Sequence, residues 1–238
     1  MIIQHIPCNL NKLSSHYIIR LKTKLMDNTK GEFDLNLGRI YDARFKKYGA
    51  TPKGSYWISE ARQNLRFKIL LHETTKLQKQ DYFSIGDIGC GYGALANYIS
   101  KTQYAQSIRY YGYDISEALI NHCRLPPRFH WATFEKGSHP HIKMDFCLMS
   151  GTYNLSAAKH ADEWEDYIFR NLSACWLKTK VAIIFNLQID KEARISSRNI
   201  FYGNKSSILH RCNLNFGPTL SVENINLSHD TTFVVQRK

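Results

Sequence analysis

The chain has no long hydrophobic run. Its longest apolar stretches, such as VAIIF at 181–185, are far shorter than the roughly 20 residues that a helix needs to cross a bilayer. The first residues carry no basic segment, and Gln4, His5 and Asn9 interrupt their apolar positions, so they do not read as a signal peptide. We therefore expect no membrane-spanning helix and no membrane partner, and a cytoplasmic protein.

Paired cysteines and metal-ligand spacings are also absent. The chain has no Cys-x-x-Cys pair, and no histidine stands at ligand spacing from a cysteine. This pattern argues against a disulfide framework and against a zinc site. We expect no metal, and reduced, mostly buried thiols at all six cysteines: Cys8, Cys90, Cys123, Cys147, Cys175 and Cys212.

Negative charge is scarce in the amino-terminal third. Residues 1–80 hold 15 Lys and Arg against 6 Asp and Glu, so they carry +9 of the net +12. Such a region can attract nucleic acid, an anionic metabolite or an acidic protein surface, or can be a solvated face, and charge alone does not choose among these. Length and composition fit a single globular unit.

From residue 82 onward, short apolar runs alternate with amphipathic ones, as in β-α units on a parallel sheet. The expected strands are 83–88, 109–113, 129–134, 145–150 and 181–187. The expected helices are 92–101, 116–123, 161–177 and 204–213. The end of the chain, from Thr219, predicts an antiparallel hairpin at the sheet edge. The fold class is thus α/β, a Rossmann-like doubly wound, mostly parallel sheet.

The amino-terminal 80 residues differ in kind. A helix is expected after a capping Ser59, with Leu65, Ile69 and His72 along one side. Upstream, YDARFKKYGATPKGSYW at 41–57 predicts a short helix and a loop over the sheet's active edge. We expect residues 1–80 to be a helical extension or lid, not an independent domain, on a domain at 81–238.

The segment IGDIGCGYGAL, from Ile85, carries the chemistry. Its first strand should end near Ile88, and Gly89, Gly91 and Gly93 would turn the chain and let a ligand approach the main-chain N–H groups. With Ala94, this spacing also satisfies the loose dinucleotide pattern G-x-G-x-x-G/A. An NAD-dependent oxidoreductase is therefore a competing interpretation.

Asp87 separates the two cofactor classes. A carboxylate just before the glycines would repel a pyrophosphate, whereas it favours a cofactor with an ammonium, a sulfonium and no phosphate. Asp114, after the second strand, can accept hydrogen bonds from both hydroxyls of an unphosphorylated ribose. Asp114 therefore supports adenosine binding in S-adenosylmethionine and in NAD alike, whereas Asp87 favours S-adenosylmethionine over NAD.

The motifs DIGCGYG, YGYDIS and MDFCLMSGTYNL resemble those of the class I S-adenosylmethionine-dependent methyltransferases over roughly residues 80–190. YDARFKKYG, SGTYNL, FYGN and SHDTTFVV are similar to segments of an uncharacterised bacterial subgroup. The resemblance implies that Asp87, Gly89, Gly91 and Gly93 hold the methionine part, Asp114 the ribose, and Ile115 the adenine. Cys90 and Ser150 join this cofactor set.

Adenine recognition departs from the family pattern. The family often has an acidic residue just after the third strand, where this chain has Thr133 followed by Phe134. We expect these two residues near the adenine, with Glu135 or a main-chain carbonyl as the alternative acceptor of its amino group.

Acceptor and lid residues are less defined. Tyr153 and Asn154, at the sheet's carboxyl edge, are candidates to contact the acceptor or the sulfonium. His229, paired with Asp230, is a candidate to accept a proton from the acceptor. Their alternative roles are turn formation and structural hydrogen bonding. Arg44, Tyr41 and Trp57 are either a lid over the cofactor or core residues of the extension.

The sequence therefore predicts a methyltransferase acting on an O or N atom of a small anionic or polar metabolite. An RNA or protein methyltransferase that docks its substrate on the basic region is the alternative. A catalytically silent adenosylmethionine-binding protein fits the same cofactor motifs.

Overall fold

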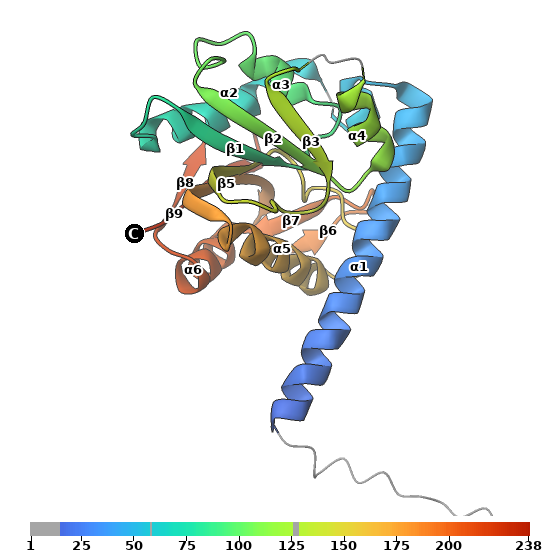
Figure 1. Ribbon diagram of the computed structural model, residues 1–238. Helices are drawn as coiled ribbons and strands as arrows, with labels where there is room; N and C mark the ends of the chain where they lie inside the picture. The colour runs from blue at the N-terminus through green and yellow to red at the C-terminus, as the bar shows by residue number, and fades with distance from the viewer. Residues whose placement is uncertain (1–14, 58, 126–128) are drawn as a thin grey trace, which may run out of the picture.

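A computed structural model describes residues 15–57, 59–125 and 129–238, and Figure 1 shows a central sheet with helices on both faces. The parallel core of the sheet has the strand order β3-β2-β1-β4-β5. Their bounds are β1 Phe83–Ile88, β2 Ile108–Asp114, β3 Ala132–Lys136, β4 Met144–Met149 and β5 Thr179–Asp190.

The end of the chain extends this sheet with antiparallel strands. β9 (Asp230–Gln236) pairs antiparallel with β5, and β8 (Thr219–Glu223) pairs antiparallel with β9. The predicted terminal hairpin and the mostly parallel, Rossmann-like sheet are thus confirmed. Two short strands were not predicted: β7 (Phe201–Asn204) pairs with the last residues of β5, and β6 (Arg194–Ile195) pairs with β7.

Helices cover both faces because the strands are apolar on both sides. Along β5, Ile183 and Phe185 pack into one core layer, while Ala182 and Ile184 pack into the other. The alternation follows from side chains pointing to opposite faces of a strand. The helices are α1 Ser15–Tyr48, α2 Glu60–Leu77, α3 Ala94–Ile99, α4 Glu117–Arg124, α5 Ala161–Trp176 and α6 Lys205–Asn215.

Helix α1 is longer than the short helix that the sequence predicts. It runs along one side of the sheet (Figure 1) and ends at Tyr48. Gly49 follows with φ +65°, a left-handed conformation that ends helices. A 3₁₀ turn, η2 (Pro52–Ser55), then leads toward α2.

Helix α2 begins as predicted, because the Ser59 hydroxyl accepts a hydrogen bond from the Arg62 N–H at 3.3 Å. The side of the helix that carries Leu65, Ile69 and His72 is not its most buried side. His72 is exposed and Leu65 and Ile69 are only partly buried, whereas a different set is fully buried. That set is Gln63, Arg66, Phe67, Leu70, Leu71, Glu73 and Thr74.

The cysteine prediction holds where the structure tests it. Cys90, Cys123, Cys147, Cys175 and Cys212 are free and buried, and Cys8 lies outside the described residues. Across the described residues, no helix is long and apolar enough to cross a membrane.

Candidate active site

The turn after β1 requires its glycines. Gly89, Gly91 and Gly93 all have positive φ, at +74°, +58° and +81°. The N–H groups of Gly89 and Cys90 donate to the Tyr113 carbonyl at 2.7 and 3.0 Å. A Cβ on Gly89 would lie 2.7 Å from the Thr152 methyl carbon. The left-handed backbone and this close approach leave no room for a side chain at Gly89.

Asp114 ends β2 and binds the same turn. Its two carboxylate oxygens accept hydrogen bonds from the Ser116 N–H at 2.8 Å and the Gly91 N–H at 2.9 Å. Burial raises the pKa of Asp114 to about 6, although these backbone hydrogen bonds lower it. The carboxylate is therefore held in one orientation at the carboxyl edge of the sheet.

Asp87, one strand away, is buried with 2% of its surface exposed. Its Oδ2 accepts a hydrogen bond from the Tyr110 hydroxyl. Burial raises its pKa to about 7, the Tyr110 hydrogen bond lowers it, and the charge of Asp114 raises it. A cationic ligand beside this carboxyl would favour the ionised form.

A cavity lies at this edge of the sheet, and its space, including the part that is open to solvent, is about 850 Å³. Ten of the residues predicted for the site line it. They are Tyr41, Trp57, Asp87, Gly89, Cys90, Gly91, Asp114, Ile115, Ser150 and Tyr153.

Thr133 and Phe134 do not line this cavity. The third strand runs from Ala132 to Lys136 and ends two residues later than predicted, so both residues lie inside it. The Phe134 ring packs against Gly112 in the core, where a Cβ on that glycine would meet it at 2.6 Å. Gly137 and Ser138, which follow the strand, line the cavity instead.

Four other predicted residues also lie outside the cavity lining. Gly93 caps α3 and faces the Phe129 ring. Arg44 donates to the Lys53 carbonyl at 2.8 Å and stacks over the Tyr56 ring at 3.7 Å. His229 is exposed, and Asn154 lines a neighbouring cavity.

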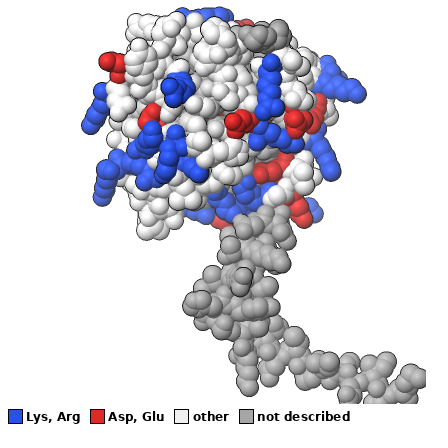
Figure 2. All heavy atoms as spheres, viewed as in Figure 1, with Lys and Arg blue, Asp and Glu red and all other residues white. Residues whose placement is uncertain are grey.

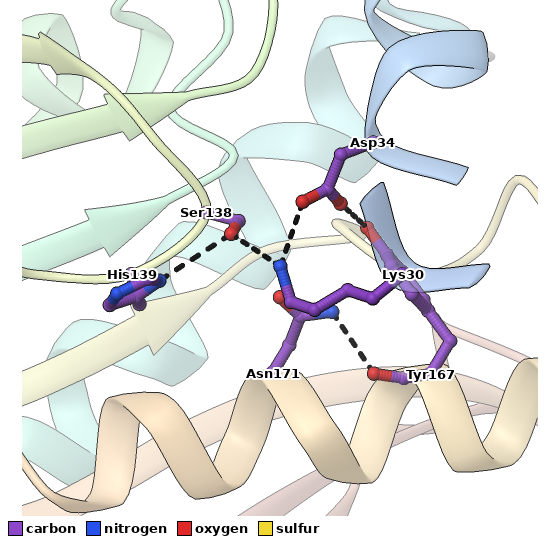
Figure 3. A network of polar contacts seen from close by, with 6 residues as sticks. All are labelled: Lys30, Asp34, Ser138, His139, Tyr167 and Asn171. Atoms are coloured by element: carbon purple, nitrogen blue, oxygen red, sulfur yellow. Dashed lines mark hydrogen bonds and ion pairs between the residues drawn. The ribbon is translucent and has the colours of Figure 1, made fainter. Parts of the chain in front are cut away.

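A polar network adjoins the cavity, and Figure 3 shows its residues. Lys30 on α1 donates to Asp34 at 2.7 Å and to the Ser138 hydroxyl at 2.9 Å. Asp34 also accepts from the Tyr167 hydroxyl of α5 at 2.6 Å. Since Ser138 and Tyr167 line the cavity, this network fixes α1 and α5 against the loop that follows β3.

Tyr153 is buried, and its hydroxyl has no hydrogen-bond partner within the described parts of the chain. Burial raises its pKa well above the ordinary value, and nearby thiol and phenol groups raise it further. The phenol is therefore neutral near pH 7 and is suited to donate a hydrogen bond rather than to take a proton.

A second cavity adjoins the first, with about 560 Å³ of space including the part that is open to solvent. The two share Tyr41, Ser55, Trp57 and Gly151 in their linings. The second one is also lined by Asn154, Arg62 and Arg66. Chemistry at the boundary of the cavities can therefore involve a ligand in each.

A buried chain of polar contacts supports this boundary. The Gly151 N–H donates to the Asn186 side chain at 2.7 Å, and the Asn186 amide donates to Asp230 at 2.8 Å. The other Asp230 oxygen pairs with Arg66. Asp230 is thus occupied by Arg66 and Asn186, and no contact pairs it with His229 among the described residues.

Sequence reasoning missed Arg66, Gln63 and Asn186. The signal for the first two was present, because Gln63, Arg66, Phe67, Leu70 and Thr74 recur at helical spacing. A polar residue on that stripe is easily read as solvent-facing.

Comparison with known proteins also points to the methyltransferases. No family model matches the chain. Over 146 residues it is 25% identical to Rv1506c of Mycobacterium tuberculosis, which is provisionally named a methyltransferase; the match covers 60% of this chain and 86% of that protein.

Solved structures show the fold more directly. Magnesium protoporphyrin IX methyltransferase from Synechocystis, crystallised with S-adenosylmethionine, matches with a TM-score of 0.52 at 13% identity, over 74% of this chain and 80% of that one. A provisionally named O-methyltransferase from Nostoc punctiforme matches with a TM-score of 0.52 at 12% identity, over 78% and 61%. The chain has the Rossmann-like fold of the class I S-adenosylmethionine-dependent methyltransferases.

Proposed function

We propose that the protein transfers a methyl group from S-adenosylmethionine to an O or N atom of a small anionic or polar molecule. The observation that carries the proposal is the pair of buried carboxylates, Asp87 and Asp114, on either side of a positive-φ glycine turn in one cavity. Asp114 would accept from the ribose hydroxyls, and Asp87 would face the ammonium of the methionine part. Ile115, Gly137 and Ser138 would border the adenine.

S-adenosylmethionine supplies a methyl carbon on a sulfonium. The acceptor's lone pair bonds to that carbon as the carbon–sulfur electron pair returns to sulfur, and the proton of the acceptor hydroxyl or amino group is released to solvent. The chain's task is to hold the acceptor in line and exclude water. Trp57, Tyr41 and Gly151 stand where the two cavities meet, which suits them to that task. Among the described residues, no cluster of His, Cys, Asp and Glu could hold a metal ion.

The amino-terminal region would act as a lid that belongs to the catalytic unit. Leu37 and Tyr41 of α1 and Trp57 after η2 all line the first cavity. On this proposal residues 1–80 complete the site of the domain at 81–238 and do not fold as a separate unit.

An RNA or protein methyltransferase is the alternative. Figure 2 shows Lys and Arg side chains in several parts of the visible face, with Asp and Glu among them. Part of the amino-terminal charge is engaged internally, since Lys30 pairs with Asp34 and Arg66 with Asp230. These two pairs reduce the positive charge that the region could offer to phosphates.

Label transfer tests the proposal. The full chain is incubated with methyl-labelled S-adenosylmethionine, total bacterial RNA, and the small-molecule and protein fractions of a bacterial extract. We expect label in the small-molecule fraction. Label in RNA, with RNA retention that weakens steeply as salt rises, would support the alternative. Binding of the cofactor without any transfer would indicate a silent binding protein.

A further inference from the structure

The second cavity has an excess of positive charge. Arg62 and Arg66 line it, and no Asp or Glu is among its described lining residues. Arg66 is compensated by Asp230. For the Arg62 side chain, no hydrogen bond or ion pair is present among the described residues. The cavity therefore carries about one uncompensated positive charge by this pairwise balance.

The positive charges of the Arg62 and Arg66 guanidinium groups repel each other. The pKa of Arg66 is lowered by burial and by the positive charge of Arg62, while Asp230 raises it. Arg66 is 6% exposed, its Nε has no hydrogen-bond partner within the described chain, and its guanidinium lies 4.7 Å from the centre of the Trp57 ring. An anion entering the cavity would relieve this repulsion and satisfy buried donors.

The other residues that line the second cavity indicate which chemical groups a ligand would have besides its anionic group. Tyr41, Trp57 and Leu155 offer rings and an aliphatic surface. The Asn154 Oδ1 and the Ser55 hydroxyl are buried and have no partners in the described structure. Ser55 Oγ lies 3.5 Å from where a Cβ on Gly91 would stand. The Ser55 hydroxyl therefore lies beside the cofactor turn, and a hydrogen-bonding group on the ligand would satisfy it there.

We infer that the second cavity binds a small organic monocarboxylic acid whose carboxylate pairs with Arg62 and Arg66 and whose hydroxyl or amino group faces Asn154 and Ser55. That group is the methyl acceptor, so the inference rests on the proposed function. A monoanion matches the single excess charge. A phosphate monoester dianion would leave a negative charge uncompensated in a half-enclosed site.

The test uses calorimetric titration of the full chain saturated with S-adenosylhomocysteine. The probes are 4-hydroxybenzoate, its neutral analogue 4-hydroxybenzamide, and phenyl phosphate. We expect the acid to bind about ten-fold or more tightly than the amide, because one charge-assisted contact is worth about that factor. Arg62→Gln should abolish this preference, and Arg62→Lys should restore part of it.

Lys68→Gln is the matched control, because Lys68 is an exposed cation on the same helix and outside both cavities. It should keep the preference for the acid. Arg62→Gln should leave the affinity for S-adenosylhomocysteine within about two-fold, since Arg62 does not line the first cavity. This readout separates loss of the acid site from misfolding.

The inference is overturned by equal binding of acid and amide, by no binding of either, by a preference that survives Arg62→Gln, or by tighter binding of phenyl phosphate. In each of these cases, intact binding of S-adenosylhomocysteine leaves the proposed function standing. Absence of that binding overturns the proposed function and, with it, the assignment of the acid as methyl acceptor.

Discussion

Asp114→Asn should weaken binding of S-adenosylhomocysteine by about a hundred-fold or more while leaving the protein folded. The carboxylate accepts from the Gly91 and Ser116 N–H groups, and on our proposal it also accepts from two ribose hydroxyls. An amide keeps the shape but removes the charge and one acceptor. Two charge-assisted hydrogen bonds at about 1.5–3 kcal/mol each account for the size of the loss. Isothermal titration measures it.

Asp162→Asn is the control for this variant. Asp162 is an exposed carboxylate in the first turn of α5 and lies outside both cavities. Its removal should leave the affinity unchanged within error. An unchanged affinity in Asp114→Asn would contradict a role for Asp114 in holding the ribose.

Asp87→Asn should stabilise the free protein at pH 8 and weaken cofactor binding at the same time. Burial raises the pKa of Asp87 from 3.8 to about 7. The folded chain therefore keeps a proton between about pH 4 and 7 that the unfolded chain has lost, and stability falls as pH rises through that window. Above pH 7 the ionised carboxylate costs on the order of 4 kcal/mol.

Urea unfolding at pH 5 and pH 8 checks this prediction. Asp87→Asn should gain stability over the wild type at pH 8 and clearly less at pH 5, because pH 5 lies only about one unit above the ordinary pKa at which the loss begins. Its affinity for S-adenosylhomocysteine at pH 8 should fall by about ten-fold or more, since the ligand's ammonium loses its partner. A variant less stable than the wild type at pH 8 would contradict the account of Asp87 as a strained, functional carboxylate.

The part of the fold that local pattern determines was predictable. The β-α alternation, the glycine turn and the terminal hairpin follow from periodicity and from glycines whose positive φ few other residues tolerate. Asp87 and Asp114 were placed correctly at the strand ends because a strand's carboxyl end can be read from its apolar run.

The predictions that failed depended on the exact ends of strands and on contacts between residues far apart in the sequence. The third strand ends at Lys136, and an error of a few residues there exchanged Ser138 for Thr133 at the cavity wall. Phe134 faces the core because Gly112, on the neighbouring strand, leaves space for its ring. No local pattern contains that information.

The second cavity illustrates the same limit. Arg66 on α2, Asn186 on β5 and Asp230 on β9 meet only in the folded chain. Each alone reads as an ordinary polar residue. Their association positions Gly151 through its hydrogen bond to Asn186. The polar residues around the second cavity could therefore be identified only from the three-dimensional structure.

The identity of the cofactor is the central claim, and calorimetric titration of the wild-type chain with S-adenosylmethionine, S-adenosylhomocysteine and NAD tests it most directly. We predict that the first two bind and that NAD does not, because the buried Asp87 repels a pyrophosphate. Binding of NAD, with none of either sulfur compound, would contradict the assignment.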